Sequence, residues 1–405
     1  MKLKQIMDEP MKSLLYMERY VNDGSPSGFT WINQTSWMTS PLSGQEIFYL
    51  DALYGEDQIT ITGEDPGFLS KFGGKMIFIH PDMYEQYHGK GIRSEKSVLK
   101  VVPTASSRTV KLLDFPGYVK LNYNGIIGRI DRSLTDVHAQ ASIEMTSYLK
   151  EALKKPIYHR LAFLPESGAV IYKNEAKDIN MGMVYREEVP YGQSSGEIKC
   201  MIPLFSVFSF DRHAEDECIL VQLIKKSRRE PQEYVLNELI FVIIDNYFEL
   251  LLNEGIQPEW HSQNLLLGIG RDYSVVSLIM RDLESIDIDE NLQKRINIKK
   301  KFNSYPYKYL NNNQYNYQMK HSFMYDFKIG EYVFKPIIEC VCGYFGLNKE
   351  DFEKIIRDYS KQYIKRLPSD FFPSDHSWYS FEQVLIDRTI EQRPYIKNEG
   401  VKYRE

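Results

Sequence analysis

The segment 232–253 constrains the fold more than any other part of the chain. Its apolar side chains recur at helical spacing, and apolar residues also occupy much of the opposite face. Pro231 precedes the segment and Gly255 follows it, so the helix has a defined beginning and end. Because a helix that is apolar on most sides must be buried, we expect it to lie inside the C-terminal half, with other elements packed around it.

The first 190 residues show a different pattern. Short runs that favour strands, separated by Gly and Pro, occupy 58–62, 75–80, 97–102, 118–122, 161–163 and 169–172. One helix is expected at 136–154, with Ser133 or Thr135 as its cap. These patterns predict an α+β fold in two parts: a β-rich domain over 1–190, with an antiparallel sheet, and a mainly helical domain over 191–405.

The second part contains further elements beyond the buried helix. We expect strands at 265–268 and 275–280, then helices at 332–345, 349–364 and 380–388. Between them, residues 291–320 are rich in Lys, Asn and Tyr. We interpret this stretch as a solvated loop, with phosphate binding as the alternative.

Composition excludes several classes of function. The chain has 405 residues and a formal net charge of −5, whereas nucleic-acid-binding proteins usually carry a basic excess. No run reaches the ~18 apolar residues that a membrane span needs, and the first 17 residues mix charges throughout. The four cysteines lack zinc-ligand spacing, which favours reduced thiols. We therefore expect a cytoplasmic protein that binds neither nucleic acid nor membrane.

The stretch 102–109 places hydroxyl groups and a guanidinium at a corner between a strand and a turn. The hydroxyls of Ser106, Ser107 and Thr109 can donate hydrogen bonds to phosphate oxygens. Arg108 offers a planar fork that suits the same oxygens. The alternative interpretation of such a stretch is an ordinary polar turn.

A lysine joins this group if the chain reverses direction. Lys120 begins a second strand, and an antiparallel pair with its turn at 114–117 would bring Lys120 back near Arg108. Arg129 and Arg132 follow a short distance later. Together these cations predict a pocket for a polyanion.

A second polar group lies between the buried helix and the apolar strand 265–268. It contains Glu259, His261, Gln263 and Asn264. A hairpin between 265–268 and 275–280 would set Asn264 beside Asp282. Their amide and carboxylate oxygens are ligands that Mg²⁺ accepts, with phosphates and waters completing its shell. A polar turn that hydrogen-bonds to itself is the alternative.

These motifs, in this order, resemble the siderophore synthetases that work independently of nonribosomal peptide synthetases, the aerobactin-synthetase-like family. The family carries Pro-Thr-x-Ser-x-Arg-Thr, a Lys-Leu strand, a substrate-side arginine, a strand ending in Arg-Glu, then Glu-x-His-x-Gln-Asn and Arg-Asp. The matching residues here are Pro103, Thr104, Ser106, Arg108, Thr109, Lys120, Leu121, Arg132, Arg186, Glu187, Glu259, His261, Gln263, Asn264, Arg281 and Asp282.

The resemblance implies a cupped-hand fold, with fingers over 1–190 and a palm over 191–405, and a role for each site residue. The ATP-binding residues would be Ser106, Ser107, Arg108, Thr109, Lys120, His261, Gln263 and Asn264. Mg²⁺ would lie between Asn264 and Asp282. Arg132, His261 and Arg186 would hold the substrate, and Arg132, His261 and Lys120 would be catalytic.

The reaction that the resemblance implies is adenylation of a carboxylic acid, often citrate or a citrate derivative. An amine or hydroxyl then attacks to give an amide or ester. A homodimer is a further possibility.

The sequence departs from the family pattern in two places. Gly128 stands where the family usually has a Thr that helps to hold the substrate, so the acid can differ from citrate. The first motif begins near residue 103, so we expect the N-terminal thumb to be missing or cut down. Candidates for the family's late substrate-side lysine are Lys361, Lys365 and Arg366.

Two alternatives from other functional classes remain at this stage. A kinase-like small-molecule phosphotransferase has a similar His-to-Asn segment, a strand and an Asp. Such enzymes place an Asp two residues after the His, where this chain has Gln263, and they carry a glycine-rich loop that is not evident before Lys120. The other alternative is a non-catalytic relative that binds a nucleotide or a ferric chelate.

Overall fold

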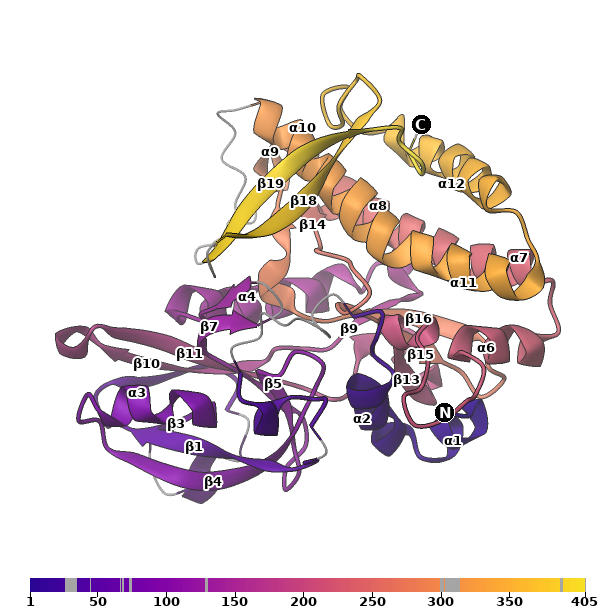
Figure 1. Ribbon diagram of the computed structural model, residues 1–405. Helices are drawn as coiled ribbons and strands as arrows, with labels where there is room; N and C mark the ends of the chain where they lie inside the picture. The colour runs from indigo at the N-terminus through magenta and orange to yellow at the C-terminus, as the bar shows by residue number, and fades with distance from the viewer. Residues whose placement is uncertain are drawn as a thin grey trace.

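Two large sheets, three two-stranded sheets and a group of long helices make up the described part of the structure (Figure 1). This computed structural model describes residues 1–25, 35–43, 45–65, 67, 69–72, 75–127, 130–298, 302, 314–386 and 389–404. Gly128, Arg129 and most of the stretch 299–313 lie outside the described residues.

The first sheet is antiparallel and has eight strands in the order β2-β10-β11-β6-β5-β4-β1-β3. The strands are β1 (Phe48–Tyr54), β2 (Ile59–Gly63), β3 (Met76–Ile79), β4 (Ser94–Pro103), β5 (Thr109–Leu112), β6 (Tyr118–Leu121), β10 (Gly168–Asn174) and β11 (Ile179–Arg186). Their alternating apolar residues form one core, in which Leu50, Val101 and Val119 are fully buried. The predicted antiparallel sheet of the N-terminal half is confirmed.

Helix α4 (Asp136–Ala152) covers the sheet near β10 and β11, where Ala139 packs with Ala169 and Val184. Thr135 is its N-cap, as predicted, and the backbone N–H of Thr135 donates to Nδ1 of His138 at 3.2 Å. Shorter elements of this half are α3 (Tyr84–His88), β7 (Tyr123–Ile127) and β8 (Ile130–Arg132).

The second sheet lies beside the first and has five strands in the order β12-β9-β16-β15-β13. These are β9 (Leu161–Phe163), β12 (Tyr191–Gly192), β13 (Cys200–Pro203), β15 (Leu265–Ile269) and β16 (Val275–Met280). Helices α1 (Leu3–Asp8) and α2 (Pro10–Tyr20) lie next to β13 in Figure 1, and Leu14 of α2 packs on Leu266 and Ile279. The N-terminal helices thus pack on a sheet whose other strands come from much later in the chain.

The helix predicted over 232–253 is present and buried. It consists of α7 (Pro231–Val235), a π-helical turn η7 (Leu236–Ile240) and α8 (Phe241–Glu254), and it ends at Gly255 with φ +60°. Ile243, Tyr247 and Leu251 are fully buried. Smaller neighbouring elements are α5 (Leu204–Val207), α6 (Ile219–Ser227), β14 (Ile256–Gln257), β17 (Asp287–Ile288) and α9 (Glu290–Arg295). The predicted α+β class, with a mainly helical C-terminal part, is confirmed.

The C-terminal helices run above both sheets (Figure 1). They are α10 (Gln314–Ser322), α11 (Lys335–Phe345) and α12 (Lys349–Ile364). Between α10 and α11 lies a π-helix, η9 (Phe323–Phe334), which the 3.6-residue pattern does not predict. Because π-helical turns are rare and often occur at functional sites, we expect η9 to contribute residues to such a site.

The helix predicted over 380–388 is wrong. The segment is a strand, β18 (Ser377–Ile386), which pairs with β19 (Thr389–Glu399) from Ser377↔Glu399 to Ile386↔Thr389. Backbone pairing with a partner strand along its whole length outweighs the local helical spacing of a short apolar run.

None of the helices in the described part of the chain is long and apolar enough to cross a membrane.

The turn between β5 and β6 depends on Gly117. Its φ is +82°, and a Cβ at this position would lie 2.6 Å from the carbonyl oxygen of Arg186 and 2.7 Å from the ring of Tyr185. This turn sets Lys120 opposite Thr109, so the predicted reversal that brings Lys120 back towards Arg108 is confirmed.

We predict that Gly117→Ala lowers the free energy of unfolding by more than the roughly 1–2 kcal/mol that a left-handed non-glycine residue costs. The excess comes from the close approach to Arg186 and Tyr185. Gly346→Ala is the matched control, because Gly346 has φ +68° but open space around its Cβ position. Urea denaturation measures both variants, and equal losses would contradict the prediction.

Candidate active site

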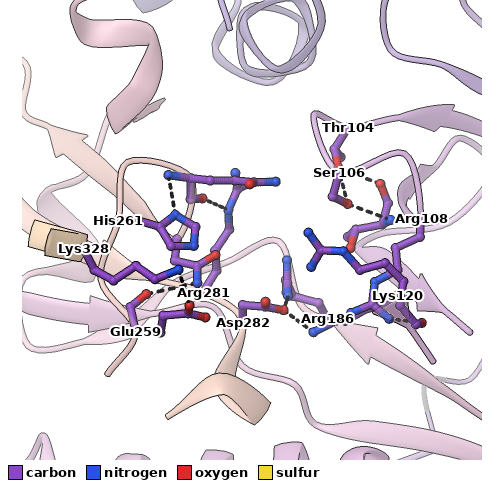
Figure 2. Close-up of a pocket in the computed structure, with 14 residues that line it drawn as sticks. Thr104, Ser106, Arg108, Lys120, Arg186, Glu259, His261, Arg281, Asp282 and Lys328 are labelled. Carbon is purple, nitrogen blue, oxygen red and sulfur yellow. Dashed lines mark hydrogen bonds and ion pairs between the residues drawn. The ribbon is translucent and has the colours of Figure 1, made fainter. Parts of the chain in front are cut away.

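A polar pocket lies where the two sheets meet η9 (Figure 2). Its lining residues are Thr104, Ser106, Arg108, Thr109, Lys120, Arg132, Arg186, Glu259, His261, Gln263, Asn264, Arg281, Asp282 and Lys328. We call the residues from the first half of the chain the first wall, and those from 259 to 282 the second wall. The structure thus brings together nearly all of the predicted site residues.

The first wall begins with the loop between β4 and β5, which internal hydrogen bonds hold in shape. The hydroxyl of Thr104 donates to the carbonyl oxygen of Thr109 at 2.6 Å, and the N–H of Thr109 donates to Oγ of Ser106 at 3.0 Å. Ser107 has φ +63°, a strained value for a residue with a side chain. Ser107 is fully buried and is not among the lining residues, whereas Ser106 and Thr109 are.

Lys120 on β6 is buried and contacts two carboxylates. Its Nζ forms ion pairs with Oδ1 of Asp282 and, at 2.7 Å, with Oε1 of Glu284. Arg108 reaches the same Glu284 oxygen at 3.3 Å, and its other amino group donates to the carbonyl oxygen of Arg132 at 2.7 Å. The ion pair between Lys120 and Asp282 therefore connects the first wall with the second.

Arg186, at the end of β11, completes this charge network. Its Nη2 lies 3.1 Å from Oδ1 of Asp282 and 2.5 Å from Oε1 of the buried Glu166. Burial raises the pKa of the Asp282 carboxyl, but Lys120 and Arg186 outweigh it and hold that pKa well below its ordinary value. Asp282 is therefore ionised at neutral pH.

The predicted hairpin between β15 and β16 is confirmed and forms the second wall. Leu265 pairs with Met280, and the N–H of Arg281 donates to the carbonyl oxygen of Asn264 at 3.0 Å. Asp282 follows with φ +73°, a strained backbone conformation for a residue with a side chain. In this conformation its carboxylate contacts Lys120.

His261 is neutral in this wall. The N–H of Gln263 donates to its Nδ1 at 3.2 Å, which assigns the proton of the neutral ring to Nε2. Burial lowers the pKa of His261 to about 4, against the opposing effect of the Glu259 charge. His261 can therefore offer an uncharged hydrogen-bond donor at neutral pH.

Glu259 forms an ion pair with Lys328 of η9, with 2.8 Å between Oε1 and Nζ. Burial raises the pKa of Glu259, but nearby cations, led by Lys328, outweigh it and lower that pKa to about 2. In Figure 2, Glu259, His261 and Lys328 lie at one end of the pocket, and Ser106, Arg108 and Lys120 lie at the other.

Arg132 also lines the pocket. Its Nε donates to the carbonyl oxygen of Ile127 at 3.0 Å, which fixes the side chain. Burial and the nearby Arg108 lower the pKa of Arg132 to about 10, against the opposing effect of nearby carboxylates, and this guanidinium stays charged at neutral pH. An anion bound beside Arg132 would be stabilised by it.

Charge balance defines what the pocket can accept. Six cationic side chains and two carboxylates line it, and the buried carboxylates Glu18, Glu166 and Glu284 behind the lining pair with four of these cations. The cations include guanidinium groups that can bind planar or tetrahedral anions through two hydrogen bonds. The arrangement suits a polyanion held along the pocket, with a second anion near His261 and Lys328.

Sequence reasoning missed Lys328 and Glu284. Glu284 lies two residues after Asp282, a spacing that could have suggested a shared site. Lys328 has no local signal, since it lies on a π-helix far along the chain from the other motifs. The candidates for a late lysine, Lys361, Lys365 and Arg366, are exposed on or just after α12 and are not among the lining residues.

Comparison with known proteins identifies the fold that contains this pocket. No family model matches the chain, and no curated protein matches its sequence. Solved structures do match. The ATP-bound aerobactin synthetase IucA of Klebsiella pneumoniae aligns with a TM-score of 0.66 and 12% identity, over 93% of this chain and 76% of that one.

Two further structures agree with this result. Aerobactin synthetase IucC of Klebsiella pneumoniae aligns at TM-score 0.63 and 12% identity, over 84% of this chain and 67% of that one. The petrobactin biosynthesis protein AsbB of Bacillus anthracis aligns at 0.60 and 15%, over 82% of this chain and 64% of that one. The chain has the aerobactin-synthetase fold, as its motifs predicted, although it spans only 64–76% of these relatives.

We predict that acid unfolds the protein partly by protonating His261. Because the pKa of His261 is about 4 in the folded chain and ordinarily 6.5, the unfolded state binds the proton first as pH falls through this window. Stability is therefore lost between about pH 6.5 and 4. His261→Gln keeps a hydrogen-bond acceptor but cannot titrate.

Urea denaturation at several pH values measures this effect. The loss of unfolding free energy between pH 7 and 4.5 should be smaller in His261→Gln than in the wild type by roughly 1–3 kcal/mol. His159→Gln, which changes an exposed histidine, is the control. Parallel curves for His261→Gln and the wild type would show that this histidine does not contribute.

Proposed function

We propose that the protein is an ATP- and Mg²⁺-dependent synthetase. It activates a carboxylic acid as an acyl-adenylate and joins the acyl group to an amine or hydroxyl. The observation that carries the proposal is the cation-rich pocket with a neutral histidine at one end, in a fold shared with an ATP-bound aerobactin synthetase. The likeness also supports a place in siderophore biosynthesis.

The nucleotide phosphates are assigned to the end of the pocket that carries Ser106, Arg108 and Lys120. Hydroxyl, guanidinium and ammonium groups lie together there, and an internal hydrogen bond holds the loop between β4 and β5 in shape. Gln263 and Asn264 line the same pocket from the second wall. Ser107, being buried behind the loop, is assigned to holding the loop in shape.

The carboxylic acid is assigned to Arg132, His261 and Lys328. Arg132 and Lys328 offer positive charge, and His261 offers a neutral donor, which together suit an acid with more than one carboxylate. Attack of a carboxylate on the α-phosphorus brings negative charges together, so it depends on positioning and charge neutralisation rather than on a strong base.

Arg186 has a supporting part in this assignment. Because Glu166 and Asp282 already pair with it, Arg186 is better placed to orient Asp282 than to hold the acid by itself.

The residues of the second wall fit a Mg²⁺ ion carried by the nucleotide. The side-chain amide N–H of Asn264 donates to the backbone carbonyl oxygen of Glu259 at 3.1 Å, which leaves the side-chain oxygen of Asn264 to act as a ligand. Lys120 and Arg186 both contact Oδ1 of Asp282, so Oδ2 is the oxygen left for a cation. Bound there, Mg²⁺ would neutralise phosphate charge.

The described residues contain no cluster of three or more His, Cys, Asp or Glu side chains that could hold a metal. The proposed Mg²⁺ ion would take only one or two ligands from the protein and keep waters and phosphate oxygens in the rest of its shell.

The product assay tests the proposal. The protein is incubated with ATP, Mg²⁺, a panel of dicarboxylic and tricarboxylic acids, and a diamine or amino alcohol. We expect pyrophosphate release that depends on the acid, sustained AMP formation only when both an acid and a nucleophile are present, and neither product after EDTA. ADP would instead identify a phosphotransferase, and binding of ATP without turnover would identify a non-catalytic relative.

We predict that Lys328→Met raises KM for the acid roughly tenfold or more, the loss expected for one charge-assisted hydrogen bond, and leaves KM for ATP nearly unchanged. Lys361→Met is the matched control, since it removes an exposed lysine outside the pocket. Steady-state kinetics with each substrate varied in turn measures the effect. A rise in KM for ATP alone would contradict the assignment of Lys328.

A further inference from the structure

Helix α2 joins the two walls although none of its residues lines the pocket. Leu14 and Met17 anchor it among residues of the second sheet and the helices around that sheet. The last turn of α2 then carries two charged side chains, Glu18 and Arg19, whose exposed fractions are only 2% and 3%. Charged groups are rarely buried to this degree unless they are paired.

The carboxylate of Glu18 bridges the two walls directly. Its Oε2 accepts a hydrogen bond from the N–H of Ala105 at 3.1 Å, in the loop between β4 and β5. Its Oε1 accepts from Nη1 of Arg281 at 2.5 Å, at the end of β16. One side chain therefore binds the phosphate-side loop of the first sheet and the hairpin of the second.

Arg281 passes this restraint on to the motif residues. Its Nε donates to the carbonyl oxygen of Gln263 at 2.8 Å, and its backbone N–H donates to the carbonyl oxygen of Asn264 at 3.0 Å. Since Glu18 neutralises the guanidinium, Arg281 serves to fix the second wall more than to attract an anion.

Arg19 makes a parallel connection to the first sheet. Its guanidinium donates to the carbonyl oxygens of Ser43 at 2.7 Å and of Pro41 and Gln45 at 3.3 Å each. These residues precede β1. The consecutive residues Glu18 and Arg19 thus hold two separate segments of the first-sheet body, while α2 itself is fixed to the second.

We infer that Glu18 and Arg19 are positioning residues that set the spacing of the two walls, and so the affinity for the nucleotide. Neither lines the pocket, so they act through the loop 104–109 and through Arg281. An unpaired carboxylate or guanidinium at such burial is costly, and this cost resists widening of the gap. The inference rests on the proposed function only for the identity of the nucleotide.

Glu18→Gln tests the inference. A glutamine side chain has a single oxygen, so it can accept from Ala105 or from Arg281, and its amide group then faces the other donor. Glu9→Gln is the matched control, because Glu9 lies on the boundary of the same helix and its side chain is 49% exposed.

Two measurements are made on the full-length protein. Amide hydrogen exchange without ligand should be faster at 104–109 in Glu18→Gln, with β15 and β16 unchanged, and Glu9→Gln should match the wild type. Titration calorimetry with MgATP should show affinity about tenfold weaker in Glu18→Gln, as expected for one lost charge-assisted hydrogen bond. Wild-type exchange at 104–109 together with wild-type affinity would overturn the inference.

Arg19→Lys keeps the test decisive if Glu18→Gln does not fold. Lysine retains the charge but cannot reproduce the fork that binds three carbonyl oxygens. Exchange at 41–45 should rise and MgATP affinity should fall, and an unchanged affinity would overturn the inference. If the wild type itself fails to bind ATP, the proposed function fails, whereas the exchange results still decide whether the two residues hold the walls together.

Discussion

The rest of the pocket depends on the ion pairs that the Asp282 carboxylate forms. This carboxylate meets Lys120 from β6 and Arg186 from β11, so one residue at the end of the second-sheet hairpin joins two strands of the first sheet. Glu166 and Glu284 balance the remaining charge of these cations. Buried ion pairs lose much of their attraction to desolvation, and so they specify geometry more than they add stability.

The same pairing bears on the proposed function. Asp282 pairs with cations that would otherwise attract a phosphate group. With a nucleotide and Mg²⁺ bound, Lys120 would contact phosphate oxygens and the Asp282 carboxylate would hold the metal. Such an exchange of partners would keep opposite charges together, which suits a buried site.

The spacing of apolar residues and the position of turns predicted most of the main helices and strands, because these elements are determined by residues close in sequence. The hairpins β5–β6 and β15–β16 each join neighbouring segments, so the approach of Lys120 to Arg108 and of β15 to β16 followed from strand patterns and turns. The buried helix followed from its apolar faces. Short apolar runs carry less information, and the segment that begins at Ser377 became a strand because β19 pairs with it.

Contacts between distant segments could not be predicted in this way. Lys328 reaches Glu259 from a π-helix, which the 3.6-residue period does not reveal, and Glu18 contacts Arg281 across 263 positions of sequence. Ser107 illustrates a different limit: its residue type suits phosphate binding, but a left-handed backbone turns it away from the lining and into the protein. Residue type and order identify a motif, whereas side-chain direction depends on the folded backbone.

The pairing of the pocket's cations also affects how fast a ligand arrives. The whole chain carries a formal charge of −5, and buried carboxylates offset most of the lining cations, so an anion meets a weakly repulsive molecule at long range and attractive groups only within the pocket. Such a field concentrates anions at one place on the surface rather than over all of it. Dissolved salt screens both contributions within about 10 Å at 0.1 M ionic strength, so capture by this pocket is a short-range event that follows a largely unguided approach.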